Sequence, residues 1–320
     1  MNSAASPPLS IGLTVAIVAL VGETPLILAR GTGNGAPALP FGPFHPLHHR
    51  TFEIGLRAFV AEQVGVSLGY AEQLYTFGDR GRHSRPGDPD PHVVSVGYLA
   101  LTRLDETTRL DEAKSSPGGA FRPWYDFFPW EDWRQGRPAL IDHVILPALT
   151  RISKPRGTPF AERVHRLFGQ GPDLAHDEAA LDRYELLYEA GLVEEAARDQ
   201  RDNALSDAQR PALGRSMQFD HRRILATAMG RLRAKLKYRP VIFDLMPESF
   251  TLTALQRNVE AIAGRRLHKQ NFRRLVFGAD IVEDTGGVET STGGRPAALY
   301  RFARSDGEAR TTSGLRIGWH

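Results

Sequence analysis

Short apolar runs separated by polar turns fill the first third of the chain and predict a sheet. LTVAIVAL, PLILAR and VVSVGYLAL are rich in β-branched residues, and Gly22-Glu23 separates the first two runs as a turn would. Before the third run, TFEIGLRAFVAEQVGV has helical spacing and would bury one face made of Phe52, Leu56, Phe59 and Val60. We therefore predict an α+β domain over residues 1–103.

The pattern changes over residues 104–215, which we interpret as an insertion. Its first part, to about Pro159, looks irregular and contains the aromatic segment WYDFFPWEDW. This segment either packs the insertion onto its neighbour or offers a surface on which a ligand stacks. ALDRYELLYEAGLVEEAARD then predicts helix, as does DHRRILATAMGRLRAKL in the following unit, residues 216–246. We expect that unit to be a connecting helix and a strand.

The last unit, residues 247–320, has the pattern of a winged helix. TLTALQRNVEAIAG predicts a helix with Thr251 or Thr253 as N-cap and Gly264 after its end. HKQNFRRLVF follows a short turn as a second helix, which is the helix-turn-helix pattern. Two strands, near residues 281–283 and 298–302, would be joined by the glycine-rich loop DTGGVETSTGGRP.

Charge suggests what this second helix does. The net charge of the chain is only +3, so an anionic partner needs a local basic patch, and residues 257–274 hold six Lys or Arg against one Glu. If Phe272, Leu275 and Val276 face the core, the outward residues can read base edges and bind phosphates. We predict DNA contacts from Lys269, Gln270, Asn271, Arg273 and Arg274, with Arg295 of the glycine-rich loop as a further contact. A protein-binding winged helix and a merely solvated face are the alternatives.

The remaining composition limits the setting of the protein. With 320 residues and 41% hydrophobic residues, the chain can bury a core and form more than one domain. It has no cysteine, which excludes disulfides and thiolate chemistry and is compatible with the cytoplasm. The apolar run Ile11–Gly22 is shorter than the roughly 20 residues that a bilayer needs, so we expect a buried strand and no membrane contact.

LPFGPF followed by TFEIGLRAFVAEQVGV resembles the Nudix box, whose helical glutamates bind magnesium for diphosphate hydrolysis. That chemistry needs several carboxylates on one helix face to hold hard cations. Here only Glu62 matches a box carboxylate, with Gln63 beside it, and Glu53 lies on a different face. The resemblance thus implies a Nudix-like α/β/α sandwich with no catalytic residues and no metal site.

YAEQLYTFGDRGRHSRPGDPDPHVVSVGYLAL, the segment from FDHRRILATAM to NFRRLV, and GGRPAALYRF resemble the Nudix-related transcriptional regulators of NAD metabolism, the NrtR group. WYDFFPWEDWR and YELLYEAGLVEEAARD are similar to the alphaproteobacterial NAD regulators of the NadQ kind. The group often has an acidic cap where this chain has His268, so we assign His268 no capping role. The resemblance implies a dimeric repressor of NAD biosynthesis genes, bound to an inverted-repeat operator on double-stranded DNA.

It also implies a nucleotide effector, ADP-ribose, NAD or ATP, and no required cofactor. We expect the effector to meet the following residues of the Nudix-like domain: Arg30, Arg57, Glu62, Arg80, Arg82 and Arg85. His83 and His92 lack metal-ligand spacing, and we assign them no metal. An active Nudix hydrolase of ADP-ribose or a related dinucleotide is the alternative function, and a protein-docking scaffold is a third.

Overall fold

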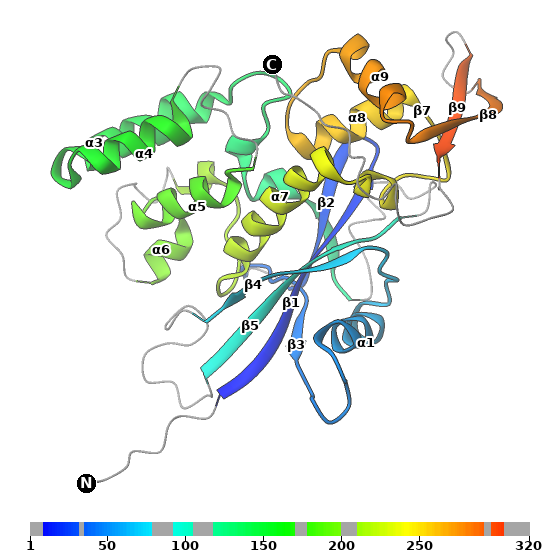
Figure 1. Cartoon of the computed structure of the whole chain (residues 1–320). Helices are drawn as coiled ribbons and strands as arrows, with labels where there is room; N and C mark the ends of the chain where they lie inside the picture. The colour runs from blue at the N-terminus through cyan, green and yellow to red at the C-terminus, as the bar shows by residue number, and fades with distance from the viewer. Residues whose placement is uncertain are drawn as a thin grey trace.

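A six-stranded sheet forms the centre of the N-terminal domain. The computed structural model describes residues 9–31, 35–78, 92–104, 118–169, 178–199, 210–290 and 296–303. The strand order is β4-β5-β1-β2-β6, and β3 pairs with β1 off this path (Figure 1). The strands are β1 Leu9–Val21, β2 Thr24–Ala29, β3 Phe41–Pro43, β4 Ala71–Phe77, β5 His92–Leu101 and β6 Ala120–Pro123.

The hairpin of β1 and β2 confirms the turn expected at Gly22-Glu23. The two strands are antiparallel, and Val21 pairs with Thr24 across the turn. Gly22 has a φ of 56°, a left-handed conformation that glycine adopts without steric cost. β1 also pairs in parallel with β5 over its first ten residues. These pairings place β1 in the middle of the sheet, which explains its almost unbroken apolar sequence.

Helices cover both faces of this sheet, giving the expected α/β/α sandwich. Alternate residues of β1 belong to two different buried clusters, one against α1 (Phe52–Val64) and one against α7 (His221–Tyr238). The Thr51 hydroxyl accepts the Ile54 N–H at 3.2 Å and caps α1. The expected buried face of α1 is confirmed for Leu56, Phe59 and Val60, while Phe52 is half-buried.

The insertion is helical where the sequence predicted an irregular segment. A π-helical turn, Ile141–Ile145, leads into α3 (Leu146–Arg156), and α4 (Thr158–Phe168) follows. The π-helical turn and α3 lie in the part expected to be irregular, whereas α4 lies almost wholly beyond Pro159, where helix was expected. Pro147 in the first turn of α3 removes no hydrogen bond that the helix needs. α5 (Ala180–Glu189) and α6 (Glu194–Arg198) complete the insertion, and α5 packs on α7.

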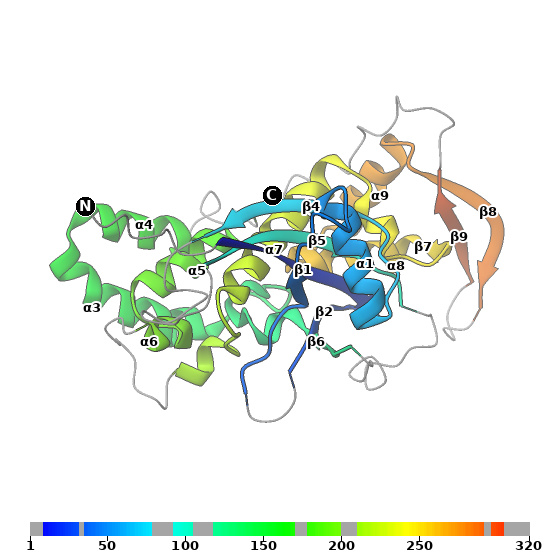
Figure 2. The same ribbon diagram turned by 90° about the horizontal axis from the view of Figure 1, so that it is seen from below.

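The aromatic segment of the insertion packs into the core. Two short 3₁₀ turns, Trp124–Asp126 and Pro129–Glu131, carry it, and four of its rings have no exposed surface: Trp124, Phe127, Phe128 and Trp130. The packing interpretation is therefore confirmed for these four side chains. Figures 1 and 2 show the insertion helices at one end of the molecule and the C-terminal unit at the other.

The connecting unit contains the expected helix but not the expected strand. After α7, Val241–Asp244 form a 3₁₀ helix that follows Pro240. Val241, Ile242 and Phe243 are all buried, and a short apolar run of this kind does not distinguish a strand from a buried turn. The prediction of a strand in this unit is therefore wrong.

The C-terminal unit has the architecture of a winged helix. Its elements are β7 Ser249–Thr251, α8 Leu252–Ala263, α9 Lys269–Gly278, β8 Val282–Glu289 and β9 Ala297–Phe302, with the sheet order β7-β9-β8. The Thr251 hydroxyl accepts the Ala254 N–H at 3.1 Å, and Gly264 ends α8 with a φ of 74°, as predicted. β8 extends further than expected: after a bulge between Asp284 and Val288, where Asp284 accepts the Gly286 N–H at 2.8 Å, Val288 and Glu289 pair again with β9.

No helix among the described residues combines the length and apolar character needed to cross a membrane.

Candidate DNA-binding surface and effector site

Helix α9 packs against the winged-helix core through two side chains. Phe272 and Val276 are one helical turn apart and almost fully buried, whereas Leu275 is half-buried. The predicted inward face is thus confirmed for Phe272 and Val276 and partly for Leu275. Neighbouring Phe277 is half exposed and contacts the edge of the Tyr300 ring on β9 at 6.0 Å between centroids. These contacts fix the rotation of α9 and so decide which side chains face outward.

The outward side chains of α9 are those predicted to meet DNA. All five predicted residues on this helix are exposed: Lys269, Gln270, Asn271, Arg273 and Arg274. Within the described ranges, no acidic side chain forms an ion pair with these three cations. His268 occupies the N-cap position of α9, and its side chain makes no capping hydrogen bond. The face can therefore offer cations and amide groups to an anionic partner.

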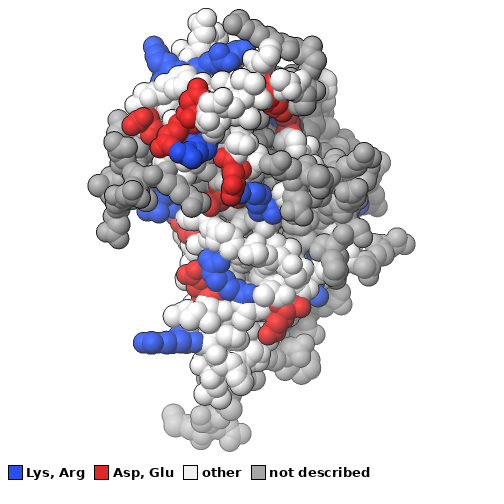
Figure 3. Space-filling view, turned by 90° about the vertical axis from the view of Figure 1, so that its right-hand side faces the viewer, with Lys and Arg blue, Asp and Glu red and all other residues white. Residues whose placement is uncertain are grey.

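The other cations of the same basic stretch point elsewhere. Arg257 and Arg266 form ion pairs with Glu23 of the sheet domain, and the Arg265 guanidinium lies 5.2 Å from the centre of the Trp133 ring. Figure 3 shows basic side chains at the top of the molecule, where α9 lies in Figure 1, and acidic side chains below them. The basic stretch thus divides into a free face on α9 and a set that joins the winged helix to the rest of the chain.

The described part of the wing is acidic. Glu283 and Asp284 are exposed on β8, Glu289 is half-buried at its end, and Arg301 of β9 pairs with Glu283 at 3.0 Å. Arg295, the predicted wing contact, lies outside the described residues. A phosphate contact by the wing would have to come from its tip, because β8 would repel the DNA backbone.

The predicted effector residues occupy two different places on the Nudix-like domain. Arg30, directly after β2, donates from Nη1 to Gln63 Oε1 at 2.5 Å. Gln63 and the exposed Glu62 lie in the last turn of α1, so this contact joins the end of β2 to the end of α1. Gly118 lets the start of β6 approach this corner, because a Cβ there would overlap Val64 Cα. The corner formed by Arg30, Glu62 and Gln63 is the candidate effector site.

Arg57 lies on another face of α1 and already has partners. Its Nη1 donates to Leu68 O at 2.9 Å, its Nη2 to Gly69 O at 3.2 Å, and its Nε to Glu53 at 3.0 Å. These bonds hold the loop after α1 in place, so an effector would have to compete with them. Arg80, Arg82 and Arg85, together with His83, lie outside the described residues.

The carboxylates needed for Nudix chemistry are not gathered in the described part of the chain. No three His, Asp or Glu side chains within those ranges cluster as a metal site requires. Glu53 is bound to Arg57, away from Glu62, and Gln63 stands beside Glu62 without a charge. The corner offers one carboxylate, one amide and one guanidinium, which can bind a polar ligand but lack the usual hydrolytic cluster.

A buried ionic group that the sequence analysis did not identify ties the insertion to the winged helix. Glu131 is almost fully buried and binds Arg183 of α5 at 2.5 and 2.8 Å and Arg233 of α7 at 2.5 Å. Arg233 also donates to Ile262 O at 3.0 Å, at the end of α8. Burial alone would raise the pKa of Glu131, but the two guanidinium groups lower it to about 2. The sequence signals this group only weakly, through the acidic Glu131 among the aromatic residues of WEDW.

Two further bonds strengthen this connection. Tyr125 donates from its hydroxyl to Ala261 O at 2.7 Å, and the backbone N–H of Trp133 donates to Gly264 O at 2.7 Å. Burial raises the pKa of Tyr125, so the hydroxyl keeps its proton for this bond. The last turn of α8, immediately before the turn to α9, is therefore fixed by the aromatic segment.

Comparison with known proteins agrees with this architecture. Residues 242–302 match the family of the NrtR DNA-binding winged helix domain. NrtR of Shewanella oneidensis, solved with a 27mer DNA, aligns with 92% of this chain and 93% of its own, with a TM-score of 0.54 and 20% identity. The chain has the NrtR fold. A MutT/nudix family protein from Enterococcus faecalis aligns over 94% of this chain and 90% of its own, with a TM-score of 0.50 and 16% identity.

A curated relative is similar over a shorter stretch. The ADPR-responsive transcriptional repressor NtrR of Acinetobacter baylyi is 43% identical over 95 residues, which are 30% of this chain and 38% of the repressor. The NrtR fold combines the Nudix-like domain and the C-terminal winged helix, and both are present here. The predicted fold class is confirmed.

Proposed function

We propose that this chain is a DNA-binding transcriptional repressor of the NrtR type whose Nudix-like domain senses a nucleotide. The observation that carries the proposal is the exposed face of α9, which has cations without acidic partners among the described residues and lies within the matched winged helix. The name of the A. baylyi relative, an ADPR-responsive repressor, supports the same function.

In this proposal α9 enters the major groove of double-stranded DNA. Arg273 would bind a guanine edge and Asn271 or Gln270 an adenine edge, because these side chains match the donors and acceptors of those bases. Lys269 and Arg274 would bind phosphates and set affinity more than sequence preference. Arg295 would add a contact from the tip of the wing.

The Nudix-like domain would bind its nucleotide without cleaving it. ADP-ribose is the first candidate effector, because the A. baylyi relative is named for its response to it, and NAD and ATP are the others. Arg30 and Glu62 are the proposed contacts at the corner of β2 and α1, with Arg57, Arg80, Arg82 and Arg85 as additional contacts. Arg30 supplies a charge for a phosphate, and Gln63 a neutral hydrogen-bonding partner.

Assembly and target complete the proposal. Two copies would bind an inverted-repeat operator in the cytoplasm, since a winged-helix pair reads two half-sites. We propose NAD biosynthesis genes as the target and the NadQ kind as the specific resemblance, on the similarity of the aromatic insertion. The functional division would follow the sequence: residues 1–103 as sensor, 104–215 as insertion, 216–246 as connection and 247–320 as DNA-binding unit.

The direct test is selection of bound fragments from a random DNA pool, followed by titration of the selected site with the full-length protein. We expect an inverted repeat that binds at least about 10³-fold more tightly than a scrambled duplex. ADP-ribose, NAD and ATP are then added separately, and one of them should change the affinity for the operator. A protein that prefers no sequence at moderate salt would be a docking scaffold, contrary to the proposal.

Hydrolysis is tested separately. Magnesium-dependent turnover of ADP-ribose is measured for the wild type and for Glu62→Gln. We expect no robust turnover in either protein, because the corner of β2 and α1 holds one carboxylate where the reaction needs several. Fast turnover that disappears in Glu62→Gln would favour the Nudix hydrolase instead.

A further inference from the structure

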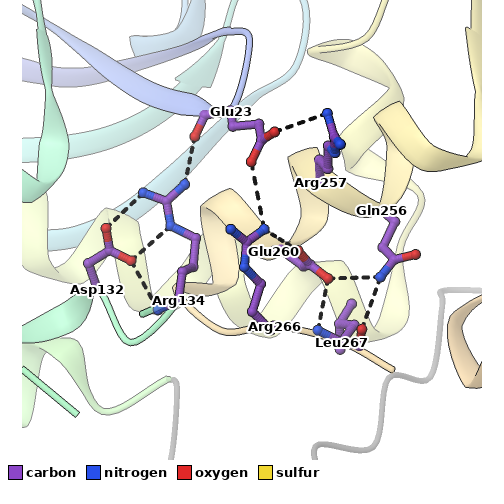
Figure 4. Close-up of polar contacts among 8 residues, drawn as sticks. All are labelled: Glu23, Asp132, Arg134, Gln256, Arg257, Glu260, Arg266 and Leu267. Atoms are coloured by element: carbon purple, nitrogen blue, oxygen red, sulfur yellow. Dashed lines mark hydrogen bonds and ion pairs between the residues drawn. The ribbon is translucent and has the colours of Figure 1, made fainter. Parts of the chain in front are cut away.

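The tip of the β1–β2 hairpin makes an ionic contact with the winged helix. Glu23 Oε1 lies 3.3 Å from Arg257 Nη1 on α8, and Glu23 Oε2 lies 3.6 Å from Arg266 Nη1 in the turn before α9 (Figure 4). The hairpin belongs to the sheet of the Nudix-like domain, whereas both arginines belong to the DNA-binding unit. Glu23 therefore bridges the two halves of the molecule.

The insertion holds the hairpin tip in place. Arg134 Nη1 donates to the Glu23 carbonyl oxygen at 2.7 Å, and Asp132 fixes the same guanidinium at 2.7 and 2.8 Å. The Arg134 guanidinium also lies 5.3 Å from the centre of the Tyr125 ring. Because its backbone is held in this way, Glu23 presents its carboxylate to the winged helix in a defined direction.

From Arg266 the contacts continue to the start of α9. Arg266 Nη1 lies 2.8 Å from Glu260 Oε2, and Glu260 Oε1 accepts the Leu267 N–H at 2.9 Å. Gln256 donates to both Glu260 and the Leu267 carbonyl oxygen, at 2.8 and 2.9 Å. Glu260 is almost fully buried, so its carboxylate needs these partners. The group sets the backbone two residues before Lys269, where α9 begins.

Strand β2 begins directly after Glu23, and its other end reaches the candidate effector site. β2 is six residues long, about 20 Å at the usual rise per residue, and Arg30 follows it directly. β1 and β6 pair with β2 on its two sides, and its residues from Pro25 to Ala29 are buried. A displacement at Arg30 would therefore be carried along a stiff strand to the Glu23 end.

We propose that Glu23 is a positioning residue that couples a nucleotide at the Arg30 corner to the orientation of α9. The inference rests on the proposed function. Each exposed ion pair contributes little to folding, so loss of Glu23 should leave the protein folded. The same small energies suffice for regulation, because a coupling between two sites commonly amounts to a few-fold to a hundred-fold change in affinity.

The test compares Glu23→Gln with Glu162→Gln, which removes the same charge from an exposed position on α4. For each protein the operator dissociation constant is measured without nucleotide and with saturating ADP-ribose, and the ratio of the two is the readout. We expect the ratio of the two dissociation constants to be about threefold to tenfold closer to one in Glu23→Gln than in the wild type. In Glu162→Gln the ratio should match that of the wild type. Equal ratios in all three proteins would overturn the inference.

A double variant identifies the partners. In an Arg257→Gln/Arg266→Gln background, Glu23→Gln should change the ratio no further, because the groups on which it acts are gone. A further change of the same size would mean that Glu23 acts through other contacts, contrary to the inference. Thermal unfolding of each variant checks that the fold persists.

Amide hydrogen exchange tests the inference without an operator. ADP-ribose should alter exchange at residues 265–268 in the wild type and in Glu162→Gln, but not in Glu23→Gln. Bound ADP-ribose with unchanged exchange there in the wild type would overturn the inference while leaving the proposed function intact. Absence of specific DNA binding, or of any response to ADP-ribose, NAD and ATP, would instead refute the proposed function on which the inference rests.

Discussion

At the scale of single residues, neighbouring arginines of one basic segment have different surroundings. Arg266, in the turn before α9, is shared by two carboxylates, whereas Arg273 on α9 is exposed with no ion-pair partner in the described ranges. Burial of Phe272 and Val276 decides this, because it sets the rotation of α9. The function of a charge in this segment thus depends on its position around the helix and not on sequence composition alone.

Arg273→Ala and Asn271→Ala should reduce sequence discrimination. A side chain that makes a bidentate contact to one base contributes about 1–3 kcal/mol to the preference for that base. Affinities for the selected operator and for single-base variants of it measure the change, with Arg301→Ala on β9 as control because Arg301 is paired with Glu283. Normal discrimination in both α9 variants would mean that α9 is not the recognition helix.

Lys269→Ala should weaken binding to every DNA to a similar degree. A lost phosphate contact releases fewer counterions, so the slope of log affinity against log salt should decrease by about one. Lys154→Ala on α3 removes the same charge from another exposed position and should leave the slope unchanged. A sequence-dependent loss in Lys269→Ala would instead indicate that Lys269 contacts a base.

Glu131 should make stability depend on acid pH. Its pKa is lowered from 4.5 to about 2 in the folded protein, so its stabilising contribution is complete above about pH 4.5 and is lost as the pH falls toward 2. Glu131→Gln should lower the free energy of unfolding near neutral pH by about 3–5 kcal/mol, because Arg183 and Arg233 stay buried without a counter-charge. Urea unfolding at several pH values measures both effects. If the free energy of unfolding falls between pH 4.5 and 2 as much in Glu131→Gln as in the wild type, other groups cause the fall.

At the scale of elements, Gly264 joins a helix end to the insertion. Its φ of 74° is unfavourable for other residues, and a Cβ there would overlap the Glu131 carbonyl oxygen. Gly65 ends α1 with a similar φ of 68° but has open space around it. Gly264→Ala should therefore destabilise the protein by more than Gly65→Ala, which loses only about 1–2 kcal/mol through backbone strain. Equal losses in chemical unfolding would mean that the contact with the insertion contributes nothing.

The elements that could be predicted are those with local signals. Thr251 and Gly264 mark the ends of α8, and the spacing of Phe272 and Val276 defines the inner face of α9. α3 was not predicted, since Pro147 and Pro155 suggested an irregular segment, and Val241–Asp244 carries the same apolar signal as a strand. For such segments, packing against distant parts of the chain decides the secondary structure, and no local sequence pattern reveals that packing.

The candidate site was predictable only as separate pieces. Arg30 and Gln63 are 33 positions apart and meet because β2 and α1 end at the same corner. Arg57 has the charge expected of an effector ligand, yet it donates to the carbonyl groups of Leu68 and Gly69. Spacing along one helix could not reveal those partners, because they lie in the following loop. The roles of these residues in effector binding remain predictions.

At the scale of the whole molecule, the insertion stabilises the junction between the Nudix-like domain and the winged helix. Glu131 binds α5 and α7, Tyr125 and Trp133 bind the end of α8, and Arg134 binds the hairpin tip at Glu23. The stretch from Tyr125 to Arg134 thus contacts the sheet domain, α5, α7 and the end of α8. This arrangement leaves the ion pairs of Glu23 as the exposed, weaker part of an otherwise buried junction.

The coupling between sites should be equal in both directions. If ADP-ribose weakens the operator complex by some factor, bound operator must weaken ADP-ribose binding by the same factor. Titration calorimetry with ADP-ribose on the free protein and on the operator complex measures this factor, and ADP-ribose at about 100 times its dissociation constant should stabilise the free protein by about 2.7 kcal/mol. Arg273→Ala should keep that stabilisation, because α9 lies far from Arg30 along the chain of contacts. Identical ADP-ribose affinity with and without operator would refute a regulatory role for the nucleotide, even if both ligands bind.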